Sequence, residues 1–455
     1  MKSNVLFLVI DSLRSDKCYG ANKSSKTPNI DKLIKNGVLF KNTISSIAAT
    51  KRATASILTG LYPYNTGAQD DNFLKLDSSI PTFVKILKEN GYHAYGTFPN
   101  VFTTTNMIDD FENENKTFDP FTGRLENQLG DEIISNLSSK KMQEPWIYYI
   151  HLLDLIRPII AHGNFNSQEF GIDKYDQIVS TIDYWLGKIL ENIDLEKTLI
   201  IITSDHGNYP STISKDEIIY HLEPGKFYQY LWKIGFNLPS FLTPLWMKVN
   251  NLYKIIFRWK KLREANKLNL SNYEKRVFVN AIGHTRDIHE DCLLTPLIFS
   301  GNGIRKFSEI SNPVRQVDIF PTLLSILKVQ FSKNEIDGHN LLSSIQSQVF
   351  EDIPIYIENL PTKENNWIKQ IGIRTNRYKY ARNITDSKKN IELYDLQTDP
   401  LEEANLSDKN LDMVIQMELI LKNINKNKNK IPHSDILDES ESKKVEDELR
   451  KLGYL

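Results

Sequence analysis

The sequence predicts an α/β fold around a mostly parallel sheet. Continuous apolar runs alternate with segments of helical spacing, which is the pattern of buried strands and the helices that cover them. Three of these runs lead directly into polar residues, at Asp11, at His151 and at Asp205. The chain has 455 residues, 40% hydrophobic and 25% charged, so it is globular and long enough for more than one domain.

The elements of the first half follow from local patterns. Val5–Ile10 is a continuous apolar run, Pro28 stands where a helix would start, and Thr82 precedes another amphipathic segment. In chain order we expect a strand at 5–10, helices at 28–37 and 80–91, a strand at 146–151, a helix at 175–190 and a strand at 198–203.

Residues 208–276 interrupt this alternation. They are rich in Tyr, Phe, Trp and Leu, and residues 241–270 contain seven Lys or Arg against one Glu, a local net charge of +6. We expect an inserted helical lid over the site, with its cations in solvent. The alternative is peripheral contact with a membrane surface through 241–263.

Sequence patterns typical of strands and helices return in the C-terminal part of the chain. We expect a strand at 295–299, a helix at 317–327 and a strand pair formed by 371–380 and 391–396. Residues 423–430 are of low complexity and read as a solvated linker. The expected division is a catalytic domain at 1–354, a C-terminal subdomain at 355–420 and a charged tail at 421–455.

Composition excludes several classes of protein. Lys and Arg number 56 and Asp and Glu 57, so the chain lacks the basic field of a dedicated nucleic-acid binder. Two cysteines, Cys18 and Cys292, do not make a disulfide framework and indicate a reducing compartment. The first residues do not resemble a secretion signal, and no run of 18 apolar residues occurs. We therefore expect a cytoplasmic protein.

The polar residues at the strand ends form a candidate metal site. Open α/β sheets place ligands at the carboxyl ends of their strands, and divalent ions take carboxylate and imidazole ligands. Asp11, Asp205 and His206 supply these groups. Taken alone, Asp205 could instead cap a helix and His206 could be a surface residue.

A series of sequence blocks resembles the sulfatase family of the alkaline phosphatase superfamily. The blocks are 9–14, 27–33, 55–63, 202–207, 290–298, 317–324, 374–380 and 392–400, in order and at similar spacing. The resemblance implies an α/β/α sandwich with a central mixed sheet and a small C-terminal α+β subdomain. It also implies one divalent ion (Mn, Zn or Ca), held here by Asp11, Asp205 and His206, and an anionic ester substrate.

The nucleophile motif departs from the family pattern. Cys or Ser followed by x-Pro-x-Arg falls on Thr50–Thr54, so Thr50 occupies the nucleophile position. The family converts Cys or Ser to formylglycine, and the methyl group on the Thr Cβ is incompatible with that route. A threonine at this position is similar to phosphoethanolamine transferases and lipoteichoic acid synthases, in which it attacks phosphorus. Thr50 could also be a helix N-cap, and the two readings are compatible.

Other positions depart from the pattern as well. Ser12 replaces the second acidic residue after the first strand, and Ile156 replaces the second His of the block that starts at His151. We expect Arg52, Arg157 and His151 to contact the substrate. His284, shortly before the Glu290-Asp291 block, is expected to be the general acid.

The expected function is therefore a metal-dependent hydrolase or transferase acting on phosphate- or sulfate-type esters of a glycan- or lipid-linked substrate, with a threonine nucleophile. Two alternatives remain: a classical sulfuric ester hydrolase, and a degenerate member that binds a glycan or phospholipid without turnover.

Overall fold

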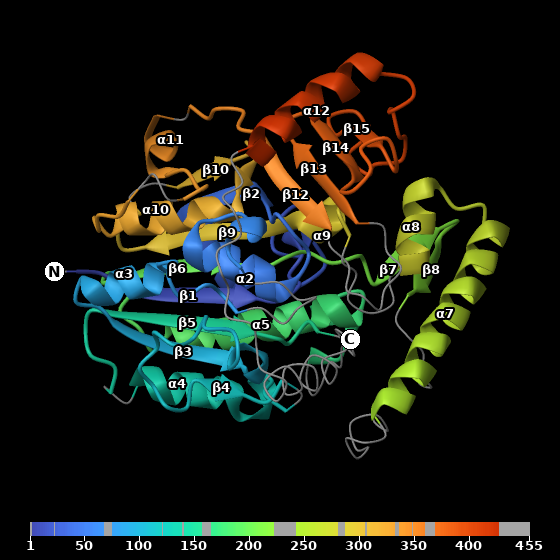
Figure 1. Ribbon diagram of the computed structural model, residues 1–455. Coiled ribbons are helices and arrows are strands. Elements are labelled where there is room, and N and C mark those ends of the chain that lie inside the picture. The colour runs from blue at the N-terminus through green and yellow to red at the C-terminus, as the bar shows by residue number, and fades with distance from the viewer. Residues whose placement is uncertain are drawn as a thin grey trace.

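A nine-stranded mixed sheet forms the centre of the molecule (Figure 1). The computed structural model describes residues 2–21, 23–67, 75–120, 122–138, 141–156, 165–222, 243–280, 287–304, 307–332, 336–347, 349–359 and 369–426. The sheet has the order β10-β2-β9-β6-β1-β5-β3-β4, and β11 also pairs with β2. Its strands are β1 (Asn4–Ile10), β2 (Gly37–Ile44), β3 (His93–Pro99), β4 (Thr117–Phe118), β5 (Trp146–Leu152), β6 (Thr198–Thr203), β9 (Leu294–Gly301), β10 (Ser308–Ile310) and β11 (Val314–Arg315).

The strands expected at 5–10, 146–151 and 198–203 are confirmed as β1, β5 and β6, which are adjacent and parallel. Every residue of these three strands is buried, which is why they appear as unbroken apolar runs rather than as alternating patterns. β9 is the exception to the parallel arrangement, since it runs antiparallel to both β2 and β6. The sheet is therefore mixed, as the resemblance implied.

Helices cover both faces of the sheet and produce a three-layer sandwich. Alternate residues of β1 point to opposite faces, so Val5 and Phe7 pack in one core and Leu6 and Leu8 in the other. Helices α2, α3 and α10 contribute to the first core, and α1, α4 and α5 to the second. The helices of the sandwich are α1 (Pro28–Lys35), α2 (Thr50–Thr59), α3 (Phe83–Glu89), α4 (Gly130–Ser138), α5 (Lys174–Leu190), α9 (Glu290–Leu293), α10 (Ile319–Ile326) and α11 (Leu342–Ser347).

A smaller antiparallel sheet forms the C-terminal region, with α12 (Leu411–Lys426) packed on it. Its strands, in spatial order, are β12 (Ile355–Asn359), β13 (Gln370–Arg374), β14 (Tyr378–Asn383) and β15 (Glu392–Asp395). The expectation of a single strand at 371–380 was wrong. A polar turn closes there, in which the Thr375 N–H donates to the Tyr378 carbonyl and the Tyr378 N–H donates to Thr375 Oγ1, so the segment is a hairpin. The domain boundaries stay predictions, and α12 runs across residues 420 and 421.

The insertion at 208–276 begins with a hairpin, β7 (Thr212–Lys215) and β8 (Ile218–His221), and continues with α7 (Thr243–Lys267) and α8 (Asn272–Asn280). Its helical character is confirmed, and the hairpin was not expected. Figure 1 shows α7 on the outside of the molecule, with α8 between it and the body.

Among the described residues, no helix has both the length and the apolar character needed to cross a membrane. Cys18 and Cys292 are both buried and free.

Candidate active site

Three parallel strands bring the candidate residues to one edge of the large sheet. β1 lies between β5 and β6, and its Val9 is in register with His151 on one side and with Thr203 on the other. Asp11 therefore leaves β1 beside the end of β5, while Asp205 and His206 leave the end of β6. The carboxyl ends of parallel strands share one edge, so residues far apart in the chain meet here.

Asp11, His151 and Asp205 form a group that fits a metal ion. Each offers one ligand atom, these atoms all lie within 4.8 Å of one another, and all three side chains are fully buried. Both ring nitrogens of His151 and Oδ2 of Asp205 have no hydrogen-bond partner among the described residues. Buried polar atoms without partners are costly, and a divalent cation would satisfy Asp205 Oδ2 and one ring nitrogen of His151. The donor set of two carboxylates and one imidazole suits such an ion.

The charges of this group also favour binding of a cation. Burial, together with the negative charge of Asp11, raises the pKa of Asp205 above its ordinary value. Two buried carboxylates side by side repel each other when both are ionised. A bound cation would remove this penalty and keep both groups ionised.

Ser12 links the two carboxylates. Its Oγ donates to Asp11 Oδ1 at 2.7 Å, and its backbone N–H donates to Asp205 Oδ1 at 3.1 Å. Ser12 has a φ of 61°, a left-handed conformation that is uncommon for serine. Tyr175 supports this turn, since its hydroxyl donates to the Ser12 carbonyl at 2.6 Å. Ser12 therefore orients both carboxylates.

Thr50 is the first residue of α2, where the helix N-terminus favours a negatively charged group. Its hydroxyl donates to Asp11 Oδ2 at 3.0 Å and lies 3.4 Å from His206 Nε2. The N-cap is Ala49 rather than Thr50, so the helix-cap reading of Thr50 was wrong by one residue. The hydroxyl thus points toward the acidic group instead of capping its own helix.

His206 adjoins both Thr50 and Asp205. Its Nδ1 lies 2.7 Å from the Gly207 carbonyl, and its Nε2 lies 3.6 Å from Asp205 Oδ2. Because a carbonyl only accepts hydrogen bonds, Nδ1 carries the hydrogen, and in the neutral ring Nε2 presents a lone pair. That lone pair can bind a metal or accept a proton, but not both at once.

Sequence reasoning missed Gln316, which holds the turn after β6. Its Nε2 donates to the carbonyls of Ser204 and Asp205 at 2.5 and 2.8 Å. Gln316 lies next to the predicted 317–324 block, and no chemical feature of the sequence indicated its contact. The turn that carries Asp205 is therefore supported from the segment between β11 and α10.

The predicted substrate contacts have different outcomes. His151 is one of the three residues that could hold a metal ion, and its contact with the substrate stays a prediction. Arg52 is buried, and its Nη1 donates to Glu358 Oε1 of β12 at 3.0 Å, so its charge is engaged in an ion pair with the C-terminal sheet. Arg157 and His284 lie outside the described residues, and their roles stay predictions.

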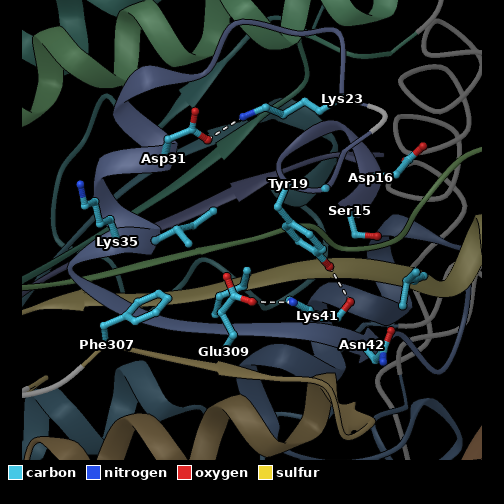
Figure 2. Close-up of a pocket in the computed structure, with 14 residues that line it drawn as sticks. Ser15, Asp16, Tyr19, Lys23, Asp31, Lys35, Lys41, Asn42, Phe307 and Glu309 are labelled. Carbon is cyan, nitrogen blue, oxygen red and sulfur yellow. Dashed lines mark hydrogen bonds and ion pairs between the residues drawn. The ribbon is translucent and has the colours of Figure 1, made fainter.

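A separate pocket of about 750 Å³ lies between η1 (Ser15–Lys17), α1 and β2, and Figure 2 shows its lining. Its lining does not include Asp11, Thr50 or Asp205. Two of its lysines are neutralised, since Lys23 pairs with Asp31 at 2.6 Å and Lys41 with Glu309 at 2.5 Å. We assign this pocket no part in the active site.

Comparison with known proteins gives consistent matches. Residues 3–329 match the family described as Sulfatase, and residues 283–430 match the family described as N-sulphoglucosamine sulphohydrolase, C-terminal. The choline-sulfatase of Rhizobium meliloti is 22% identical over 454 residues, covering 90% of this chain and 83% of that protein. Arylsulfatase K of Bos taurus is 22% identical over 457 residues, covering 92% and 81%.

Solved structures agree with the fold. The crystal structure of Ps i-CgsB in complex with k-i-k-neocarrahexaose has a TM-score of 0.64 at 17% identity, covering 99% of this chain and 98% of that one. The structure of BT1596, a 2-O GAG sulfatase, also has a TM-score of 0.64, at 15% identity with 97% and 96% covered. At these identities the likeness concerns the fold alone.

Proposed function

Since this chain belongs to the sulfatase family, we propose that it is a metal-dependent enzyme that cleaves or transfers a sulfate- or phosphate-type ester, with the Thr50 hydroxyl as nucleophile. The observation that carries the proposal is the position of this hydroxyl, 3.0 Å from Asp11 and 3.4 Å from His206 Nε2, beside the group formed by Asp11, His151 and Asp205. A hydroxyl, a lone pair and a metal-binding group at a helix N-terminus are the parts that ester cleavage needs.

Asp11, His151 and Asp205 would hold the ion. When bound, a divalent cation supplies Lewis-acid polarisation of an ester oxygen and lowers the pKa of a nearby hydroxyl. We assign His206, predicted above as a ligand, to proton transfer instead, because its Nε2 lies closer to Thr50 Oγ1 than to Asp205 Oδ2. His151 then takes the third ligand position.

In the proposed reaction, the Thr50 O–H bond breaks and its proton passes to His206 Nε2. Thr50 Oγ forms a bond to the central phosphorus or sulfur atom, and the bond from that atom to the ester oxygen breaks. His284 is the proposed donor of a proton to the leaving oxygen. Water or an acceptor alcohol then attacks the same atom and gives its proton to His284. The bond from that atom to Thr50 Oγ breaks as His206 returns a proton to this oxygen, which completes hydrolysis or transfer.

The presence of threonine at position 50 affects whether a sulfate ester or a phosphate ester is the expected substrate. The relatives are named as sulfatases, and several are named for sulfated sugars, such as the N-acetylglucosamine-6-O-sulfatase of Bacteroides thetaiotaomicron. These names support a sulfate ester, and a glycan as the carrier. The Cβ methyl of Thr50 is incompatible with the formylglycine route, which favours direct attack at phosphorus. We place phosphate-type esters first and sulfate esters second.

The test is an assay of the purified chain with Mn²⁺, Zn²⁺ or Ca²⁺ against aryl sulfates, phosphate monoesters and phosphodiesters. Thr50→Ala is expected to reduce kcat by roughly 10³-fold or more, because the attacking oxygen is removed. Thr59→Ala is a matched control at the other end of α2, where the hydroxyl donates to the carbonyl of Ala55 and accepts from the N–H of Leu61. Unchanged turnover in Thr50→Ala would remove the threonine from the mechanism, and turnover of aryl sulfates alone would reverse the order of substrates.

A further inference from the structure

Helix α7 is apolar on two faces. Its inner face packs toward the body: Tyr253 and Phe257 are half-buried with their rings 5.9 Å apart, and Ala265 is buried. Lys261 places its ammonium group 4.1 Å from the ring centre of Phe278 in α8. The inner face therefore has its partners within this chain. When the opposite face of a helix is also apolar, that face is normally covered too, by another part of the protein, by a partner or by a membrane.

The outer face carries a continuous exposed apolar stripe. Its members recur every three or four residues, which places them on one side of a helix. Their exposed fractions range from 36% to 65%, whereas large apolar side chains are normally buried when they occur in such a row. The stripe consists of Leu245, Val249, Leu252, Ile255, Ile256, Trp259 and Leu262.

Positive charge accompanies the stripe. At about 100° per residue, Arg258 and Lys260 lie on its two edges. Arg263 stacks on the Trp259 ring at 3.6 Å. Seven residues of α7 are Lys or Arg and one, Glu264, is acidic. Because the whole chain has a net charge of −1, this excess of positive charge is local to the helix.

The charge pattern of α7 indicates which kind of partner binds its outer face. A second copy of α7 against the stripe would bring two strongly positive helices together, which is unfavourable. The rim of Lys and Arg around apolar side chains instead complements a surface that is apolar inside and negatively charged outside. Trp259, with its amphipathic ring, suits the boundary between these two layers.

We propose that the outer face of α7 docks on an anionic lipid surface, with the helix lying in the plane of the interface. The apolar stripe enters the boundary between headgroups and acyl chains, and the flanking Lys and Arg side chains reach the lipid phosphates. This docking does not depend on the reaction proposed above, because none of the stripe residues belongs to the active site.

The experiment measures sedimentation of the full chain with vesicles of phosphatidylcholine containing phosphatidylglycerol, and with vesicles of phosphatidylcholine alone. Binding is expected only to the anionic vesicles and is expected to weaken as salt is added. The double variant Arg258→Gln/Lys260→Gln should weaken binding by roughly 30-fold, since each cation near such a surface contributes about fivefold.

The stripe itself is tested with the triple variant Leu252→Ser/Ile256→Ser/Trp259→Ser, which should abolish sedimentation. A matched control is Leu411→Ser/Ile415→Ser/Leu419→Ser on α12, whose side chains are similarly exposed, at 64%, 58% and 57%. That control should bind as the parent does. Circular dichroism and the thermal midpoint establish that all variants remain folded.

Results of three kinds would overturn the proposal. The first is no sedimentation of the parent chain at low salt. The second is equal sedimentation with and without phosphatidylglycerol, or loss of binding in the α12 control but not in the α7 variant. The third is a concentration-dependent dimer, seen by analytical ultracentrifugation, that the α7 triple variant dissolves, because the occupant would then be a second copy of the chain.

Discussion

The carbonyl of Gly207 determines which nitrogen of His206 faces Thr50. It accepts a hydrogen bond from Nδ1 at 2.7 Å, so the neutral ring directs a lone pair on Nε2 toward the threonine hydroxyl. His151 differs, because neither of its ring nitrogens has a hydrogen-bond partner among the described residues. We therefore assign the two histidines different tasks, proton transfer for His206 and metal binding for His151.

This division predicts different metal affinities for two variants. His151→Ala should weaken binding of a divalent ion more than His206→Ala does, as measured by titration calorimetry. A concentration of the ion 100 times its Kd should stabilise the parent chain by about 2.7 kcal/mol, and removal of the ion with a chelator should reverse this. His93→Ala is the control, since His93 lies in β3 and pairs with Glu112. Equal affinity in His151→Ala and the parent chain would contradict the assignment.

At the scale of an element, α2 is entirely buried, and both of its ends are defined. Thr50 begins it near the acidic group, and Gly60 ends it with a φ of 71°, the left-handed conformation of a C-cap glycine. The Gly60 N–H donates to the Ser56 carbonyl, and the Gly60 carbonyl accepts from the backbone of Asp337 and Gly338. Since both ends are constrained, the position of Thr50 depends on the whole helix.

Gly60→Ala should therefore destabilise the protein. A Cβ at this position would lie 3.0 Å from the Cβ of Phe320, and the positive φ adds strain, for a total cost of about 2 kcal/mol. Gly20→Ala is the comparison, because Gly20 also has a positive φ but has no atom within 4 Å of such a Cβ. Urea unfolding of both variants measures the difference. Equal losses in the two would show that contact with Phe320 contributes nothing.

At the scale of the whole molecule, buried charged residues connect the large sheet and its helices to the C-terminal sheet. Lys379 of β14 is ion-paired with Glu290 of α9 and with Glu402. Arg374 of β13 also pairs with Glu290, and His289, which contacts Asp287 at 2.7 Å, lies 3.9 Å from Glu392 of β15. A pair that is removed at one partner leaves a buried charge uncompensated, so these contacts hold the two sheets in one arrangement.

The His289–Asp287 pair predicts a pH dependence of stability. Burial alone would lower the pKa of His289, but the charges of Asp287 and Glu402 and the hydrogen bond to Asp287 together outweigh burial and raise the pKa above its ordinary value. A histidine with a raised pKa stabilises the folded state fully below its ordinary pKa, and this contribution is lost as the pH rises through the folded value. The free energy of unfolding of the parent chain, relative to His289→Gln, should therefore fall between about pH 6 and about pH 9.

Urea unfolding at both pH values measures this difference. The exposed pair of His93 and Glu112 provides a control through His93→Gln, which should show little change. A difference between the parent chain and His289→Gln that is the same at both pH values would contradict the assignment of a charged His289.

Part of the site could be predicted from the sequence, because some of its features are local. An apolar run that ends in a polar residue marks both a buried strand and its functional end, which identified Asp11 and Asp205. Thr50 was found through the motif register. Gln316 and the contact of Arg52 with Glu358 could not be found in this way, since each joins segments more than 100 residues apart and has no local signal.

The sequence by itself determined β1, β5, β6 and β9, the helices α1, α3, α5 and α10, and the chemical types at the strand ends, because hydrophobic periodicity and burial act within a few residues. Only the tertiary structure decided that β1 lies between β5 and β6, that β9 is antiparallel, that His151 joins the two carboxylates, and that α7 presents an apolar face outward. The physical reason is that strand order and side-chain contacts depend on packing between distant segments, whose free energies cannot be read from either segment alone.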